Sequence, residues 1–167
     1  MQVLVTRDLL LMVSTVSTLT NGIENSTSGL ERLIMTAQEK FIRYKDTLDI
    51  LDTLDKYHYL INIGREMPEL DDEYKIDSFK VPGCMSTVYL VPKHNGNIID
   101  FMGFSDAAIT RGVVAIVVDI FSGLTKNEIQ SIDPNYIMNG LQIPVILSAS
   151  RRNGAFNMFK MIKDYSK

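Results

Sequence analysis

The chain has 167 residues, of which 46% are hydrophobic and 22% charged, and this composition predicts one compact folded domain. A net charge of -3, from 17 basic and 20 acidic residues, provides no general attraction to nucleic acid or to an anionic membrane surface. The single cysteine, Cys84, excludes an intramolecular disulfide, a four-cysteine zinc site and an iron-sulfur cluster held by cysteines of one chain. Because only His58 and His94 remain as soft ligands, we expect no bound metal.

The first thirty residues differ in composition from the rest of the chain. An apolar run from Leu9 to Val13 is too short to cross a bilayer, and it is followed by many serines and threonines with few acids. This composition fits an organellar targeting segment and an ordinary N-terminal extension equally well. We therefore divide the chain into an extension, residues 1–30, and a domain, residues 31–167, and we expect no membrane span.

Two helices are predicted at the start of the domain. From residue 30 onward, apolar residues recur at three- and four-residue steps, which predicts a helix with one buried face. The residues of that face are Leu33, Ile34, Ala37, Phe41, Ile42 and Tyr44. A second helix should begin at Asp52, whose carboxylate can cap the amides of Leu54 and Asp55, and should end at Gly64. Its apolar positions are Leu54, Tyr57, Leu60 and Ile61.

Strands are predicted in the middle of the domain. The alternation over residues 76–81 favours a short strand that is broken at Pro82-Gly83. Residues 87–91 and 98–102 are rich in β-forming side chains, and Asn95-Gly96 between them is a hairpin turn signal. These segments therefore predict a small antiparallel sheet.

Helices are predicted again after the sheet. Residues 106–121 are almost all apolar, and their length favours a buried helix although their β-branched content would also suit a strand. Thr125 and Glu128 form a capping-box pair, and residues 155–165 predict a terminal amphipathic helix opened by Asn153-Gly154. The order of elements predicts an α+β fold, a small antiparallel sheet flanked by helices, and lacks the alternation of a doubly wound α/β domain.

Cys84 is the residue best suited to carry chemistry. It follows the Pro82-Gly83 break, where a tight backbone path places side chains at the edge of a strand, and its thiolate would be the reactive form. The alternative is a structural role, because free cysteines often behave as small buried hydrophobes. A cysteine hydrolase would need a histidine base, yet His94 is expected to lie over ~20 Å away along a strand and His58 belongs to a helix. The glycines match no phosphate-binding loop.

Several linked motifs resemble one family. They are Tyr57-His58-Tyr59-Leu60-Ile61-Asn62-Ile63-Gly64, Met67-Pro68-Glu69-Leu70, Val81-Pro82-Gly83-Cys84-Met85-Ser86, Ser105-Asp106-Ala107-Ala108-Ile109 with Arg111-Gly112, and Ser150-Arg151 with Asn153-Gly154. In order and spacing, over roughly residues 35–165, this set resembles the SufE family of sulfur-acceptor proteins. The linked set is far more specific than any one of its pieces.

The resemblance implies a fold shared with iron-sulfur scaffold proteins and a defined role for Cys84. At the matching position, the family's cysteine accepts sulfane sulfur from the persulfide of a SufS-type cysteine desulfurase, stimulates that enzyme and passes sulfur to an iron-sulfur scaffold. Pyridoxal phosphate belongs to the desulfurase, so no cofactor is expected on this chain. Two alternatives stay open: a stand-alone cysteine-dependent hydrolase, and a purely allosteric activator of a desulfurase.

The resemblance also implies supporting residues around the cysteine. Gly83, Asp106, Arg111 and Arg151 match family positions and are expected to support the loop or to bind the partner. Either arginine could also raise the thiolate fraction of Cys84. The alternative for Arg111 and Arg151 is that each is a solvent-exposed basic residue with no functional role.

Three positions depart from the family pattern. Phe104 replaces a frequent acid, Tyr89 replaces a frequent tryptophan, and Ala149 replaces a proline. Phe104 thus removes a charge expected near the cysteine loop, whereas Tyr89 keeps an aromatic side chain.

The Ser- and Thr-rich extension favours a plastid, either a chloroplast or an apicoplast, with the bacterial cytoplasm as the alternative.

Overall fold

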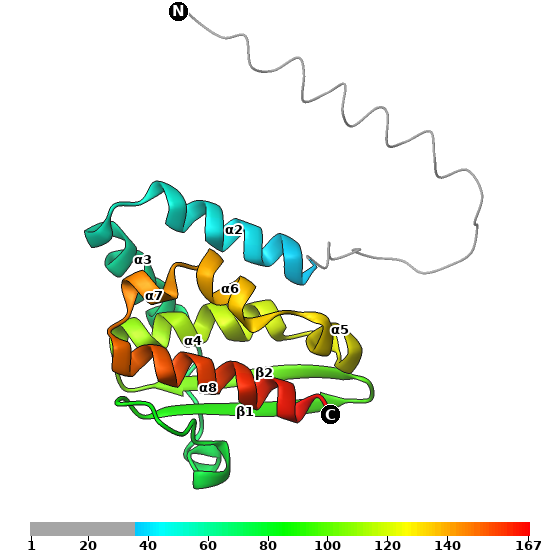
Figure 1. Ribbon diagram of the computed structural model, residues 1–167. Coiled ribbons are helices and arrows are strands. Elements are labelled where there is room, and N and C mark those ends of the chain that lie inside the picture. Colours follow the sequence, from blue (N-terminus) through cyan, green and yellow to red (C-terminus); the bar gives the residue numbers. More distant parts are fainter. Residues whose placement is uncertain (1–35) are drawn as a thin grey trace, which may run out of the picture. The chain divides into compact units, whose positions relative to one another are not determined.

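The computed structural model describes residues 36–167, in which helices lie over a small antiparallel sheet (Figure 1). The α+β class predicted from the sequence is confirmed. The predicted extension, residues 1–30, and the start of the first predicted helix lie outside the described residues. The helices are α2 (Ala37–Ile50), α3 (Thr53–Glu66), α4 (Ala108–Phe121), α5 (Lys126–Ser131), α6 (Pro134–Gly140), α7 (Ile143–Ile146) and α8 (Ala149–Tyr165), and the strands are β1 (Val88–Asn95), β2 (Ile98–Ser105) and β3 (Leu124–Thr125).

The predicted hairpin forms the centre of the sheet. Strand β1 pairs antiparallel with β2, in a register that sets Val88 opposite Ser105 at one end and Asn95 opposite Ile98 at the other. Gly96 has φ 61° at the turn, a conformation that favours glycine. The short strand β3 extends the sheet beside the first residues of β2, so the strand order is β1-β2-β3.

Two outward carbonyls of β1 are bonded within the chain. Val88 O accepts a hydrogen bond from Val81 N at 2.8 Å, and Leu90 O accepts one from Tyr165 Oη at 3.3 Å. Pro92 follows in the same register, so its missing N–H falls on the outer edge and removes no hydrogen bond between β1 and β2.

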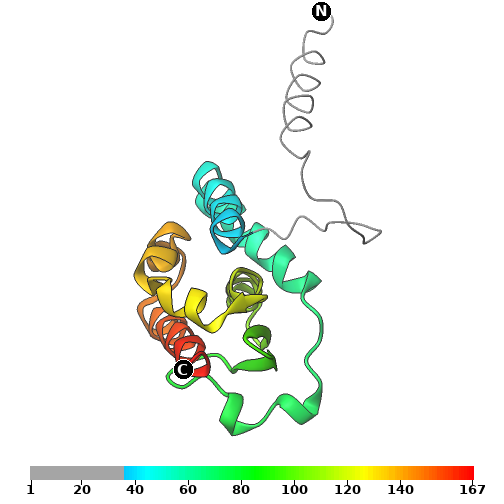
Figure 2. The same cartoon turned by 90° about the vertical axis from the view of Figure 1, so that its right-hand side faces the viewer.

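The hydrophobic core lies between the helices and one face of the sheet. Figures 1 and 2 show the helices on one side of the hairpin, while the segment with two 3₁₀ turns, Asp72–Tyr74 and Asp77–Phe79, passes the other side. Helix α4 is central because it packs against both α3 and β2. Its buried residues are Gly112, Val113, Val114, Ile116, Val117, Ile120 and Phe121. Burial on almost every side explains why this segment is apolar throughout and forms a helix despite its β-branched content.

The helix caps follow the sequence signals closely. The capping box of Thr125 and Glu128 is present, with Glu128 N donating to Thr125 Oγ1 at 3.3 Å. Asp52 accepts from Asp55 N at 2.9 Å and begins α3 as predicted. A second capping box, formed by Thr36 and Glu39, begins α2.

Several boundaries and one element were predicted wrongly. Residues 76–81 form a 3₁₀ turn and a single β-bridge from Lys80 to Tyr89, not a strand, because few neighbouring backbone groups pair with this short segment. Helix α3 continues past Gly64 to Glu66, and α8 begins at Ala149, six residues before the predicted start. Helices α6 and α7 were not predicted.

Two apolar side chains assigned to buried helix faces lie in solvent. Ile42 is 42% exposed and Leu54 is 64% exposed, whereas Phe41 and Leu60 are buried as expected. Both exposed residues lie on helices at the periphery of the fold, which leave part of their surface uncovered (Figure 1). Apolar residues scattered on a protein surface are common and do not disturb the fold.

Candidate functional site

The loop that carries Cys84 joins the second 3₁₀ turn to β1 and is tied to α8. Gly83 has φ 70°, a conformation in which a side chain is strained. A Cβ at Gly83 would also lie 2.9 Å from Nδ2 of Asn157, which donates a hydrogen bond to Pro82 O at 2.8 Å. The backbone turn that the sequence predicted at Pro82-Gly83 is therefore held in place by a side chain of the last helix.

The Cys84 thiol is half-buried against apolar neighbours. It lies beside a cavity of about 10 Å³ whose other lining residues are Val88, Thr110, Val113, Val114, Leu147, Arg151, Gly154, Ala155 and Met158. Gly154 of α8 faces the sulfur so closely that a Cβ there would lie 2.1 Å from Sγ. Burial raises the pKa of the Cys84 thiol because the apolar surroundings disfavour the thiolate.

Asp106 supports the end of this loop from the start of α4. Its Oδ1 accepts a hydrogen bond from Thr87 N at 3.0 Å, and its own backbone N donates to Thr87 O at 3.3 Å. These two hydrogen bonds fix the residue that leads from the cysteine loop into β1. Asp106 therefore contacts the end of the cysteine loop through Thr87.

The two candidate arginines have different surroundings. Arg151, in the first turn of α8, lines the cavity beside Cys84. Arg111 pairs with Glu69 at 2.8 Å, donates to Met67 O at 3.2 Å and is not among the residues that line that cavity. The structure therefore brings Arg151 to the thiol and places Arg111 at the junction of α4 with the residues that follow α3.

Phe104, which replaces a frequent acid of the family, lies beside cations. Its ring is 5.4 Å from the guanidinium carbon of Arg111 and 5.0 Å from the ammonium of Lys75. Tyr89 lies opposite Phe104 in the register and packs against it with ring centroids 6.5 Å apart. Phe104 therefore makes cation–π contacts with Arg111 and Lys75 while its ring packs against Tyr89.

Sequence reasoning missed two residues that shape the site. Asn157 holds the loop and Gly154 makes room for the thiol. Gly154 was interpreted as a helix-opening signal because glycine is unfavourable inside helices. A glycine on the inner face of a predicted helix indicates that another group approaches the helix closely at that position. This interpretation would have identified Gly154 as a contact of the thiol. Nothing in the sequence marks Asn157.

Neither histidine lines the Cys84 cavity, and His94 lies near the hairpin turn, at the opposite end of β1 from the cysteine loop. Within residues 36–167, no group of three or more His, Cys, Asp and Glu side chains is arranged to hold a metal ion. The described helices include none that is both long and apolar enough to span a membrane.

Comparisons with known proteins agree on one family. The SufE family model, described as an Fe-S metabolism associated domain, matches residues 43–166. An uncharacterized SufE-like protein of Rhizobium etli is 38% identical over 141 residues, which cover 82% of this chain and 94% of that protein. An uncharacterized SufE-like protein of Synechocystis is 35% identical over 126 residues, covering 75% of this chain and 74% of that protein.

A solved structure supports the fold. The solution structure of a hypothetical protein from Thermus thermophilus is similar with a TM-score of 0.63 at 10% identity, covering 76% of this chain and 93% of that one. The chain therefore belongs to the SufE family, whose members act as sulfur acceptors in iron-sulfur metabolism and have a cysteine desulfurase as their partner.

Proposed function

We propose that Cys84 is a persulfide carrier that accepts sulfane sulfur from a cysteine desulfurase, stimulates that enzyme and delivers the sulfur to iron-sulfur cluster assembly. The Cys84 thiolate attacks the terminal sulfur of the desulfurase persulfide, the sulfur–sulfur bond of the donor breaks, and the desulfurase thiolate leaves. One persulfide is consumed and one is formed, so the transfer needs no external oxidant or reductant. Attack by an acceptor thiolate on the terminal sulfur then passes it on and releases the Cys84 thiolate.

The observation that carries this proposal is the position of the only cysteine. Its thiol lies half-buried beside a cavity of about 10 Å³, which is close to the space of one water-sized atom. A persulfide adds one sulfur atom to the side chain, and a small shift of the apolar lining would accommodate it. Shielding of this kind slows attack by other thiols, which would otherwise remove the sulfur before delivery.

The raised pKa of Cys84 fits a carrier that reacts only when docked. In the free protein, burial disfavours the thiolate, so the cysteine is a poor nucleophile. Docking that moves the loop outward would expose the thiol and restore its ordinary pKa. Gly83 and the hydrogen bond from Asn157 to Pro82 are the features that would permit and limit this movement.

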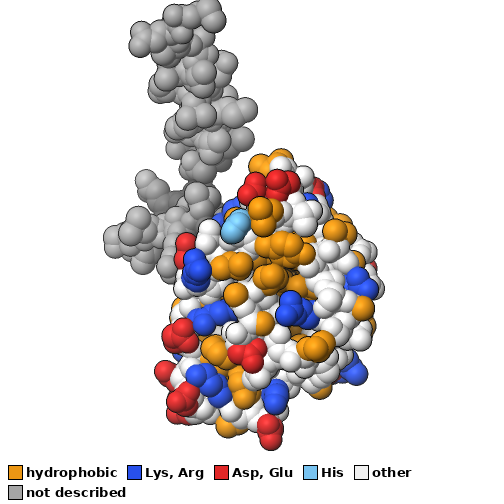
Figure 3. All heavy atoms as spheres, turned by 90° about the vertical axis from the view of Figure 1, so that its left-hand side faces the viewer, with side chains coloured by type: hydrophobic (Ala, Val, Ile, Leu, Met, Phe, Trp, Pro, Cys, Tyr) orange, Lys and Arg blue, Asp and Glu red, His pale blue; other side chains and the backbone are white. Residues whose placement is uncertain are grey.

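A partner surface lies at the end of the molecule where α3, α7 and the start of α8 meet. Figure 3 shows hydrophobic side chains gathered on this face with basic side chains among them. Leu54 of α3 and Val145 of α7 are exposed apolar residues of these elements, and Ile50 at the end of α2 and Met85 of the cysteine loop are exposed as well. Met85, next to the cysteine, is 78% exposed. We assign this face to the desulfurase, because contiguous exposed apolar surface is typical of interaction sites.

Pyridoxal phosphate is proposed to stay on the desulfurase, since transfer between two sulfur atoms requires no cofactor on the acceptor. For the location of the protein we propose a plastid, on the composition of residues 1–30, with the bacterial cytoplasm as the alternative. A hydrolase is disfavoured because no histidine lines the cavity beside the thiol.

The test is sulfur loading of Cys84→Ser. The full chain is incubated with a cysteine desulfurase and cysteine, and mass spectrometry of its peptides, prepared without reductant, follows the gain of one sulfur atom on the peptide that contains residue 84. We expect the wild-type chain to gain sulfur and the variant to fold normally without gaining any. Sulfur on the variant would refute the carrier role. If the variant still stimulated the desulfurase fully, and the wild type remained unloaded, the chain would be a purely allosteric activator.

A further inference from the structure

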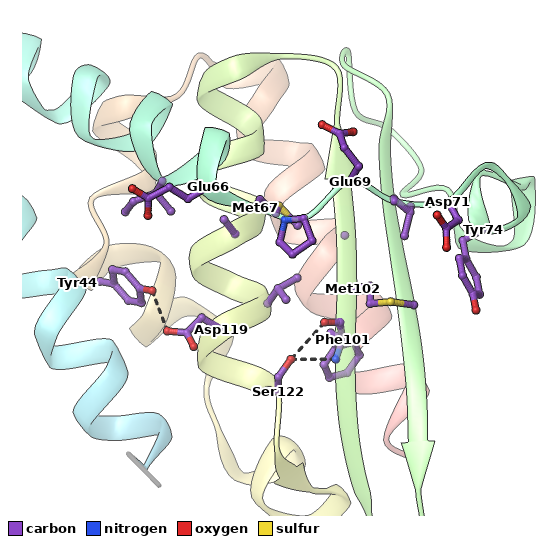
Figure 4. Close-up of a pocket in the computed structure, with 16 residues that line it drawn as sticks. Tyr44, Glu66, Met67, Glu69, Asp71, Tyr74, Phe101, Met102, Asp119 and Ser122 are labelled. Carbon is purple, nitrogen blue, oxygen red and sulfur yellow. Dashed lines mark hydrogen bonds between the residues drawn. The ribbon is translucent and has the colours of Figure 1, made fainter. Parts of the chain in front are cut away.

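A second concave site lies on the sheet, separate from the Cys84 cavity. It is a pocket of about 410 Å³ bounded by β2, α4 and the residues that follow α3 (Figure 4). Its apolar walls include Ile63, Met67, Pro68, Leu70 and Val118. A pocket of this volume suits a small ligand or a few side chains of a peptide.

One wall of the pocket is an edge of β2. The ladder between β1 and β2 uses the even-numbered residues of β2, as shown by its continuation, where Asp106 N donates to Thr87 O. The odd-numbered residues therefore direct their N–H and C=O groups to the opposite edge. Ile99 follows this rule, because its O accepts a hydrogen bond from Gly123 N at 3.0 Å.

On this edge of β2, the backbone groups of Phe101 are hydrogen-bonded, whereas those of Gly103 are not. Phe101 N donates to Ser122 Oγ at 2.9 Å, and Phe101 O accepts from the same hydroxyl at 3.4 Å (Figure 4). Gly103 is buried and lines the pocket, and within residues 36–167 its N–H and C=O have no hydrogen-bond partner on this side. An unpaired strand edge in a concave site is a template for another extended backbone.

The charges of the pocket have one sign. Its lining includes no Lys or Arg, and its carboxylates are Glu66, Glu69, Asp71 and Asp119. Basic residues of the fold already pair with Glu69 and Asp119. Glu66 and Asp71 are exposed and have no ion pair within the described part of the chain. A cationic occupant would therefore be favoured at this rim.

We propose that this pocket binds an extended segment of a partner protein in which an apolar residue is flanked by Lys or Arg. One residue of the segment pairs with Gly103 through two main-chain hydrogen bonds, so that the segment adds a strand beside β2. The apolar side chain enters the pocket and the basic side chains reach Glu66 and Asp71. This interaction does not depend on sulfur transfer at Cys84.

The test uses the isotope-labelled full chain and the peptide acetyl-Lys-Thr-Val-Thr-Lys-amide. We expect saturable shifts of the Gly103 and Val118 amide signals in nuclear magnetic resonance spectra, up to about 5 mM peptide. The same peptide with N-methylvaline lacks the central N–H and should bind at least about fivefold more weakly. A peptide with Glu in place of both Lys residues should cause no shift.

Variants of the chain test the charges. Glu66→Lys and Asp71→Lys should each weaken peptide binding about three- to tenfold, because each replaces an attraction by a repulsion. Asp46→Lys reverses an exposed carboxylate outside the pocket and should leave binding unchanged. Cys84→Ser should bind the peptide like the wild type, whether or not it loads sulfur.

Three results would overturn the proposal. The first is no shift at Gly103 at any peptide concentration. The second is equal binding of the parent and N-methylated peptides, which would mean that side chains alone fill the pocket. The third is full competition by an equal concentration of butylamine, which would identify a site for small cations.

Discussion

Replacing Gly154 with alanine should displace the Cys84 thiol from its half-buried position. Gly154 is buried in α8, and a Cβ at this position would lie 2.1 Å from Cys84 Sγ and 3.1 Å from the Cα and Cβ of the same residue. Atoms of this size rest at about 3.5–4.0 Å, so Gly154→Ala requires the sulfur to move by roughly 1.5 Å. The cysteine loop is a surface segment and can move more easily than α8.

The change in the free energy of unfolding caused by Gly154→Ala is the difference between two opposing effects. Overpacking a close contact costs about 1–3 kcal/mol, while replacing glycine by alanine inside a helix gains about 1 kcal/mol. We therefore expect the free energy of unfolding to fall by about 0–2 kcal/mol. The displaced thiol loses part of its burial, so its pKa should fall toward the ordinary value and its alkylation at pH ~7.5 should accelerate about three- to tenfold.

Iodoacetamide labelling followed by mass spectrometry measures the reactivity, and urea unfolding measures the stability. Gly140→Ala is the matched control, because its Cβ would lie 2.3 Å from Phe41 Cζ, and it should lower stability without changing labelling. Combining Gly154→Ala with Cys84→Ala removes the clashing sulfur and should remove most of the stability penalty. Wild-type labelling in Gly154→Ala, or an undiminished penalty in the double variant, would refute the reasoning.

Three further predictions concern pH and the loop. Burial and the hydrogen bond to Asp119 raise the pKa of Tyr44 to about 12. The stability gained from Tyr44 is therefore present below its unfolded pKa of ~10 and is lost as pH rises toward 12. Tyr44→Phe should abolish that part of the pH dependence of urea unfolding. The alkylation rate of Cys84 in the wild type should reach its half-maximum above the ordinary thiol pKa of ~8.5, and a midpoint at or below that value would contradict the burial of the thiol. Asn157→Ala and Asn157→Asp both lose the donor to Pro82 O, so both should speed alkylation about two- to fivefold with a loss of at most ~1.5 kcal/mol in stability, and unchanged alkylation would show that this hydrogen bond does not hold the loop.

The elements that the sequence predicted best have local causes. The hairpin depends on Asn95-Gly96 between two β-rich segments, and the start of α5 depends on Thr125 and Glu128 within one turn. Helix α6 could have been predicted too, because Asp133 accepts from Asn135 N as its N-cap and Pro134 follows at the first helical position.

The features that the sequence did not predict depend on distant contacts. Whether residues 76–81 form a strand depends on which backbone groups lie beside them, and only Lys80 has a bridging partner. The start of α8 was misplaced because Gly154 weakens the local helix signal, and the reason for this glycine is a sulfur atom seventy positions earlier in the sequence. Cys84 itself was identifiable by its uniqueness and its motif, whereas the residues that surround its thiol come from β1, α4, α8 and the position after α7 and are set by packing alone.

The outer edge of β1 has a consequence for how the protein behaves at high concentration. Exposed strand edges of two molecules can pair and nucleate aggregates, and a proline on an edge strand prevents this. Pro92 lacks the N–H that such pairing needs, while the neighbouring outward carbonyls of Val88 and Leu90 are already bonded within the chain. β1 is therefore a poor edge for pairing with a second hairpin, and a sheet built from two copies of this protein would form more readily at the opposite edge, along β2 or β3.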